Sequence, residues 1–317
     1  AFIEKRREEH DGIEEKFRRL LLQLGVSFAY VSYEELERGE LQKRGFRMLV
    51  LADAVAMSDA EVVAVRAFAA KGGVVFAEGV PAARQANCRK RPAPALDDLF
   101  GEARHVLVGN PDASCLKAME YPDKPENAAL LTAERARLEK ALQAAGIGAA
   151  RLGIVSAEDG KAILNASVFV RRDRRGNPFW GVLPAVGRGR DAVFTFPKKG
   201  QVYDLVSGRA YGCVDRLTLP LRRGIPYAFV QLGSEPQAIA EASVRGERIA
   251  VRCTTDADTV LRVEVFRPDG TEATCYARNA LAKGGKAEFT IPFARSDPKG
   301  EWKVEVTDVL GGRASAV

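Results

Sequence analysis

The feature that most constrains the fold is a strand, a helix and a second strand in close succession. The apolar run Arg47–Ala52 predicts a buried strand. A helix follows over residues 58–68, where Ser58-Asp59-Ala60-Glu61 supplies an N-terminal capping sequence. Gly72-Gly73 ends this helix, and Val74–Ala77 forms the next strand. Two strands joined through one helix pair in parallel, so we predict an open α/β sheet for residues 1–108.

The residues before this unit predict further helices and one strand. Apolar side chains from Ile13 to Leu24 recur at helical spacing, and Gly25 follows as a stop. Val26–Val31 predicts a strand, and Ser32-Tyr33-Glu34-Glu35 predicts the start of a short helix. Sheets of this class usually begin with a central strand, whereas this chain begins with a helix. We therefore expect the first strand of the sheet to be missing and to lie upstream.

The remainder of the chain changes from helical to β-rich. Residues 109–160 predict a helical connection, which could pack on the first domain, with its clearest helix over residues 132–145. Residues 161–234 and 235–317 each show short β-rich runs separated by turns such as Pro268-Asp269-Gly270. We predict two antiparallel β-sandwich domains, of which the second has a size that fits an immunoglobulin-like module.

The formal net charge of +6 raises the question of a nucleic-acid partner. The basic excess lies within residues 109–234, and its densest part is Arg171, Arg172, Arg174 and Arg175, just before Gly176-Asn177. This spacing is typical of a β-hairpin tip, where a charge cluster is normally solvated, and no aromatic platform accompanies it. We expect no nucleic-acid partner. No apolar run approaches the ~20 residues of a membrane span, so none is expected.

Cysteine and histidine usage argues against a metal site. The five cysteines form no CxxC pair, and His10 and His105 are the only histidines, so the usual zinc ligand sets are missing. Cys253 and Cys275 could pair within one domain, although scattered cysteines in odd number more often act as small buried hydrophobes. No glycine-rich nucleotide-binding motif is present, and we expect neither a metal nor a cofactor.

Two carboxylates are the candidate ligand-binding residues. Asp53 follows one predicted strand and Glu78 follows the next, and open α/β sheets place their sites at these strand ends. The alternative is that both side chains cap loops or helices at the sheet edge. The turn Ala77-Glu78-Gly79-Val80-Pro81 lacks the serine or cysteine of a nucleophile elbow, and no catalytic residue is predicted. Trp180 and Trp302 could stack on a sugar, but their strands predict core positions.

A resemblance to a known family adds to this interpretation. The segments Gly45–Asp53, Met57–Glu61 and Phe68–Val75 together resemble the trimerisation domain of TIM-barrel β-galactosidases, a degenerate relative of class I glutamine amidotransferases. The phrase Val202–Gly208 is similar to the β-domain that follows it in such enzymes, and Asp297–Trp302 resembles bacterial immunoglobulin-like modules. The resemblance implies a flavodoxin-like or amidotransferase-like sheet and a catalytic barrel upstream that carries two carboxylates.

The sequence therefore favours a non-catalytic accessory or assembly region of a larger glycoside hydrolase-like protein. Its expected partners are the upstream catalytic domain or further copies of itself, with carbohydrate as a further option. The alternative is a free-standing glycan-binding or small-molecule-binding module that uses the strand ends near Asp53 and Glu78. Unrecognised hydrolysis by these two carboxylates ranks last. The β-module architecture is compatible with secretion or a cell-surface location, which the sequence leaves open.

Overall fold

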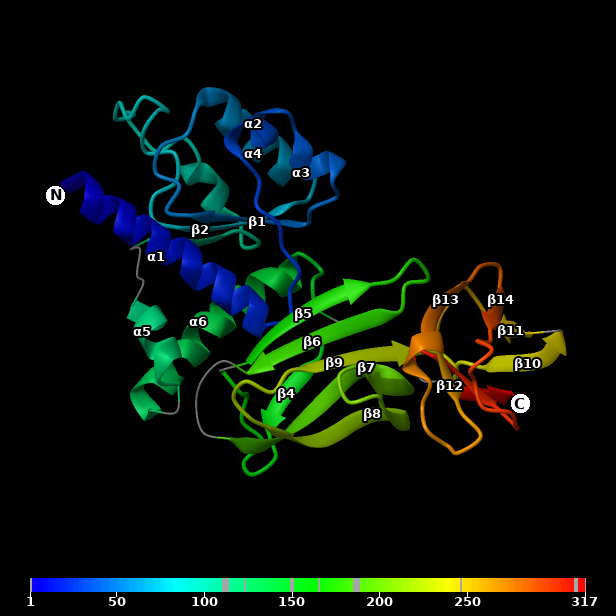
Figure 1. The fold of residues 1–317 in the computed structure, drawn as a ribbon. Coiled ribbons are helices and arrows are strands. Elements are labelled where there is room, and N and C mark those ends of the chain that lie inside the picture. Colours follow the sequence, from blue (N-terminus) through cyan, green and yellow to red (C-terminus); the bar gives the residue numbers. More distant parts are fainter. Residues whose placement is uncertain are drawn as a thin grey trace. The chain divides into compact units, whose positions relative to one another are not determined.

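The computed structural model describes residues 2–109, 114–122, 124–148, 151–164, 166–184, 189–245, 247–310 and 313–316. The chain forms two compact units, and Figure 1 shows their helices and strands. The first unit comprises Ala1–Val170, Gly181–Pro197 and Arg216–Pro226, and the second comprises Arg171–Trp180, Lys198–Asp215 and Tyr227–Val317. The domain boundaries predicted at residues 108, 160 and 234 stay predictions.

A three-stranded parallel sheet organises the amino-terminal part of the first unit. Its strands lie in the order β1 (Met48–Ala52), β2 (Val74–Glu78) and β3 (Val106–Val108). Helix α4 (Asp59–Ala70) connects β1 to β2, so the predicted strand, helix and strand are all present. A Cβ atom on Gly73 would overlap the Phe68 ring, which explains why glycine joins the end of α4 to the start of β2.

Helices cover both faces of this sheet, because successive strand residues point to opposite sides. Val74 and Phe76 pack into a core with α1 (Phe2–Gln23), α5 (Ser114–Glu120) and α6 (Pro125–Ala144). Val75 and Ala77 pack into a second core with α2 (Tyr33–Glu37), α3 (Glu40–Lys43), α4 and the 3₁₀ helix η1 (Asp97–Gly101). The result is a three-layer α/β/α arrangement with β2 buried at its centre.

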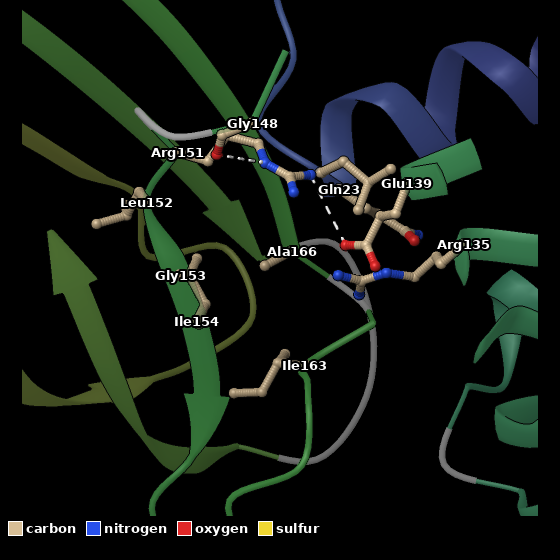
Figure 2. A pocket seen from close by; sticks show the side chains of 11 residues that line it. Gln23, Arg135, Glu139, Gly148, Arg151, Leu152, Gly153, Ile154, Ile163 and Ala166 are labelled. Carbon is tan, nitrogen blue, oxygen red and sulfur yellow. Dashed lines mark hydrogen bonds and ion pairs between the residues drawn. The ribbon is translucent and has the colours of Figure 1, made fainter. Parts of the chain in front are cut away.

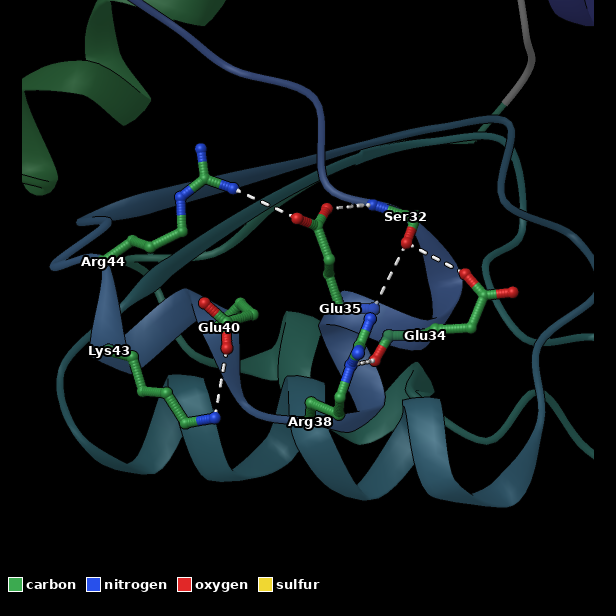
Figure 3. Close-up of polar contacts among 7 residues, drawn as sticks. All are labelled: Ser32, Glu34, Glu35, Arg38, Glu40, Lys43 and Arg44. Atoms are coloured by element: carbon green, nitrogen blue, oxygen red, sulfur yellow. Dashed lines mark hydrogen bonds and ion pairs between the residues drawn. The ribbon is translucent and has the colours of Figure 1, made fainter.

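Serine side chains fix where two of these helices begin. Ser32 accepts a hydrogen bond from the Glu35 N–H at 3.2 Å and its own N–H donates to the Glu35 carboxylate at 2.8 Å (Figure 3). Ser58 forms the same reciprocal pair with Glu61, at 3.0 and 2.8 Å. Both capping sequences predicted helix starts correctly. Arg44 adds a contact of 3.7 Å to the Glu35 carboxylate, which ties α3 to the cap.

The prediction of a strand over Val26–Val31 is wrong. These residues form an irregular connection in which Phe28 and Tyr30 are exposed and contact each other edge to face, with ring centroids 5.9 Å apart. The segment is anchored by the Ser27 hydroxyl, which donates to the Val170 carbonyl at 3.0 Å. Its β-favouring side chains have no neighbouring strand of the parallel sheet to pair with, and propensity alone does not create one.

Residues 153–232 form one six-stranded sheet in the order β4-β7-β9-β6-β5, with β8 paired to β7. The pairings β4–β7 and β7–β9 are antiparallel, so the predicted antiparallel character is confirmed. The strand order does not test the two-layer sandwich predicted for residues 161–234, which stays a prediction. The strands are β4 (Gly153–Ser156), β5 (Ala166–Arg172), β6 (Pro178–Pro184), β7 (Arg190–Asp204), β8 (Arg209–Leu221) and β9 (Tyr227–Leu232).

The last residues of the chain form two antiparallel sheets around one core. One sheet has the order β10-β11-β14 and the other β13-β12-β15-β16, and apolar side chains from both share a single buried cluster. The 3₁₀ turn η2 (Thr274–Tyr276) precedes β13. The strands are β10 (Ala238–Arg245), β11 (Arg248–Thr255), β12 (Thr259–Phe266), β13 (Arg278–Ala282), β14 (Lys286–Pro292), β15 (Lys303–Asp308) and β16 (Arg313–Ala316).

Aromatic and thiol side chains complete the description of the cores. Trp180 and Trp302 are 1% and 8% exposed, which confirms the core positions that the sequence predicts for them. Cys253 is buried in the last core, Cys275 is exposed, and both are free thiols, so the structure shows no disulfide between them. Burial raises the pKa of the Cys253 thiol to about 11.

Candidate functional site

The parallel sheet brings the two predicted ligand-binding residues together. Ala52 is the register partner of Glu78, and the Asp53 N–H donates to the Glu78 carbonyl at 2.9 Å. Asp53 and Glu78 therefore lie on adjacent strand ends, where parallel strands place their carboxyl termini side by side. Asp53 is 7% exposed and Glu78 is 0% exposed. Ligand binding by these two side chains stays a prediction.

A lysine from the first helix closes over Glu78. The Lys16 ammonium contacts both oxygens of the Glu78 carboxylate, at 2.5 Å for Oε1, and both side chains are 1% exposed. The ammonium also lies 3.7 Å from the Glu134 carboxylate on α6 and 5.2 Å from the centre of the Phe17 ring. The strand end thus holds a buried ion pair that links α1, β2 and α6.

The spacing of residues in the sequence places Lys16 on the buried face of α1, although a lysine is normally expected at an exposed position. Ile13, Lys16, Phe17 and Leu20 follow the spacing i, i+3, i+4 and i+7, which defines one face of a helix. The other three residues of this set are buried in the core against β2, and Lys16 is buried with them. A charged residue at a core position needs a partner of opposite charge. Glu78 at the end of the central strand supplies it.

The outer side of α1 shows the contrasting, exposed kind of ion pair. Glu15 accepts hydrogen bonds from Arg18 at 2.5 Å and from Arg19 at 2.6 Å, and all three side chains are 30% to 42% exposed. The hydrogen bond from Arg18 is the main cause that lowers the pKa of Glu15 to about 2, with Arg19 adding to it against a partial desolvation. Such exposed pairs stabilise a fold only weakly.

Strained backbone marks the loops that leave β1 and β2. Asp53 has φ of 52° and Ala82 has φ of 54°, the left-handed region that costs a residue with a Cβ atom about 1 kcal/mol or more. The Ala82 N–H donates to the Ala54 carbonyl at 3.0 Å, and Ala82 is fully buried. This hydrogen bond holds the two loops against each other.

His105 is a buried structural histidine. Its Nδ1 accepts a hydrogen bond from the Val75 N–H at 3.0 Å, so the ring proton of the neutral form is on Nε2, 3.6 Å from the Glu102 carboxylate. Burial, reinforced by the charge of Arg104, lowers the pKa of the imidazole below its ordinary value. The ring is therefore neutral at neutral pH and joins β2 to the segment before β3.

The arginine-rich segment predicted as a hairpin tip joins β5 to β6. The Asp173 carboxylate accepts backbone hydrogen bonds from Arg175 at 2.8 Å and Asn177 at 2.9 Å, which shape the turn. Arg172 donates to the Gly176 carbonyl at 2.8 Å. The hairpin prediction is confirmed, and the expectation of no nucleic-acid partner stays a prediction.

A pocket of about 270 Å³ lies elsewhere in the first unit (Figure 2). Arg135 and Glu139 reach it from α6, and Gln23 reaches it from the end of α1 (Figure 2). The sequence analysis singled out none of these residues, because no motif connects positions so far apart in the chain. The lining consists of Gln23, Leu24, Arg135, Glu139, Gly148, Arg151, Leu152, Gly153, Ile154, Ile163 and Ala166.

Metal sites and membrane-spanning helices are two features that the described part of the chain does not contain. Within it, no group of three or more His, Cys, Asp or Glu side chains could hold a metal ion. Over the same residues, no helix combines the length and apolar character that a membrane crossing requires.

The sequence matches no protein-family profile and no curated protein. Among solved structures, an exo-carrageenase of family GH42 from Bacteroides ovatus aligns over 68% of this chain at 9% identity with a TM-score of 0.40. The GH42 β-galactosidase Gan42B aligns over 68% at 8% identity with a TM-score of 0.46. The isomalto-dextranase of Arthrobacter globiformis aligns over 89% at 11% identity with a TM-score of 0.22.

These similarities are partial. The aligned part covers 26% of the carrageenase and 35% of the β-galactosidase, so the chain spans about a third of these proteins or less. All three TM-scores lie below 0.5, and none of the three establishes a shared fold.

Proposed function

We propose that this chain is a non-catalytic accessory and assembly region of a larger glycoside hydrolase-like protein. The observation that carries the proposal is the state of Glu78. At the strand end where open α/β sheets place reactive groups, this carboxylate is fully buried and paired with Lys16. A carboxylate held in this way fastens α1 to the sheet and is not exposed to a ligand in solution.

The sequence resemblance gives this role its specific form. The turn Ala77-Glu78-Gly79 corresponds to the elbow at which the amidotransferase relatives carry a cysteine, and glutamate here cannot act as that nucleophile. We propose that the three-layer α/β/α part is a degenerate amidotransferase-like domain that makes oligomer contacts or supports a catalytic barrel. The carboxyl-terminal sandwich would then be an immunoglobulin-like spacer or sugar-binding accessory.

The mass of the purified chain in solution and its activity test this proposal. We expect a defined oligomer by light scattering, or a complex when a candidate catalytic barrel is added, and no turnover of aryl glycosides. Hydrolysis at enzyme-like rates that disappears in both Asp53→Ala and Glu78→Gln would refute it. The upstream coding sequence is a second test, because the proposal requires a barrel of ~250 residues or more there.

A second function is favoured by the strained loops. Left-handed residues cluster at ligand sites, and Asp53 and Ala82 lie together at the carboxyl edge of the sheet. A glycan-binding or small-molecule-binding module would use Asp53 there, with α1 moving to open Glu78. Its test is an array of glycans probed with the wild-type chain and with Asp53→Ala. Identical signals from the two proteins would exclude this use of the strand ends.

A further inference from the structure

The pocket lined by Arg135 combines buried apolar side chains with several polar groups. We call it the Arg135 pocket. Leu24, Leu152, Ile163 and Ala166 are buried and form the apolar part, whereas Gln23, Arg135, Glu139 and Arg151 supply polar groups. Ligand sites for small molecules usually have this composition, with a few polar groups fixing orientation over an apolar surface. A volume of about 270 Å³ suits a molecule the size of a monosaccharide.

The charges of these polar groups do not balance within the pocket. Two guanidinium groups face one carboxylate, which leaves one positive charge in excess. Arg151 donates to the Gly148 carbonyl at 3.3 Å and lies 3.7 Å from the Glu139 carboxylate, too far for a hydrogen bond to it. Figure 2 shows the Glu139 carboxylate between the two arginines. The remaining charge is available to a singly charged anion.

Arg135 is the group that most requires a partner. Its Nη1 is buried and makes no hydrogen bond to the residues that the structure describes. Burial lowers the pKa of the guanidinium, and the charge of Arg151 lowers it further against the attraction of Glu139. A guanidinium nevertheless keeps its proton at neutral pH, so Arg135 is a partly desolvated cation with an unused donor. An oxyanion satisfies both needs.

Gln23 indicates that the ligand also carries a hydrogen-bond donor. Its side-chain Oε1 is also buried and accepts no hydrogen bond from the described residues. An amide oxygen needs a donor, and a hydroxyl group on the ligand supplies one. The ligand therefore carries an anionic group for Arg135 and at least one hydroxyl for Gln23.

We propose that the Arg135 pocket binds a sugar-sized polyol bearing one singly charged oxyanion, either a carboxylate or a sulfate ester. Glu139 disfavours a doubly charged phosphate ester, because a third negative charge would face a pocket with only two cations. The proposal goes beyond the assembly role, since it assigns a ligand to a surface that this role does not use. The loss of calorimetric binding in Arg135→Met assigns the binding to this pocket, and a failure of this test leaves the oligomer and turnover tests unaffected.

The test is isothermal titration of the full chain with D-glucuronate, glucose 6-sulfate, glucose and inorganic sulfate. We expect saturable binding of at least one acidic sugar at millimolar concentration or tighter, and weaker binding of glucose and of inorganic sulfate. Arg135→Met should weaken that binding roughly 10-fold or more, since it removes a charge-assisted hydrogen bond. Lys140→Met is the matched control: it removes an exposed positive charge from the same helix and should leave binding unchanged.

A second variant keeps the test decisive if Arg135→Met does not fold. Gln23→Met keeps the length and the charge of the site and should weaken the acidic sugar a few-fold without changing the preference for an anion. Thermal unfolding of each variant shows whether it is folded. The proposal is overturned if no acidic sugar saturates the chain, or if folded Arg135→Met binds as wild type does. It is also overturned if inorganic sulfate binds as tightly as the acidic sugars.

Discussion

The buried pair between Lys16 and Glu78 predicts a large and specific stability effect. Lys16→Met keeps the length of the side chain and removes the ammonium that contacts Glu78 at a position with 0% exposure. Breaking a buried ion pair by removing one partner costs about 3–5 kcal/mol. The control is Arg19→Met on the same helix, whose 2.6 Å bond to Glu15 joins side chains 42% and 30% exposed. That variant should cost at most about 1 kcal/mol.

A double variant measures the interaction between Lys16 and Glu78 separately from the contribution of each side chain alone. Lys16→Met with Glu78→Met removes both charges and fills the space with apolar atoms, so its loss should be smaller than that of Lys16→Met alone. The free energies come from urea unfolding followed by the helical circular dichroism signal, which reports chiefly on the amino-terminal helices. Additive losses in the double variant, or a loss below about 1 kcal/mol for Lys16→Met, would show that the pair is not the structural contact described above.

Three further predictions concern pH, thiol reactivity and packing. Glu15→Gln removes a carboxylate whose pKa the neighbouring Arg18 lowers from 4.5 to about 2. The wild type should therefore be more stable than this variant above pH 4.5 and should lose the advantage as the pH falls towards 2, as urea unfolding across that range would show. Cys253, with its pKa raised to about 11, should resist a thiol reagent at pH 8 in the folded protein while exposed Cys275 reacts; equal rates would contradict its burial. Gly73→Ala should cost about 1–3 kcal/mol because the new methyl group overlaps an aromatic ring, whereas Gly101→Ala, with open space around it, should cost less.

Local signals in the sequence predicted the first helices and strands because each has a short-range cause. The capping residues Ser32 and Ser58 and the Gly72-Gly73 stop act within one helical turn, and the structure places helix ends at or next to them. Val26–Val31 failed because a strand needs a neighbour, and the sequence of the segment does not show whether one exists. The sequence does not show the full length of β7, since its exposed centre interrupts the alternation of buried residues.

The candidate site was predictable only as far as the parallel sheet determines it. Asp53 and Glu78 lie together because adjacent parallel strands end at one edge. Lys16 comes from a helix 62 residues earlier in the chain, and its contact depends on how that helix docks. The Arg135 pocket draws on residues from 23 to 166, so only the folded chain brings its two arginines into one place.

The buried ion pair also restricts how the first helix can settle on the sheet. A shift of α1 by one residue would turn the Lys16 side chain by about 100° and move it about 1.5 Å along the axis. Apolar contacts have no direction, so the leucine and phenylalanine side chains of α1 tolerate displacements smaller than one residue at little cost. The Lys16 ammonium does not, since the displacement would move it away from the Glu78 carboxylate that it contacts in the buried core. We expect Lys16 to select one docking position for α1 among several that hydrophobic packing alone would accept.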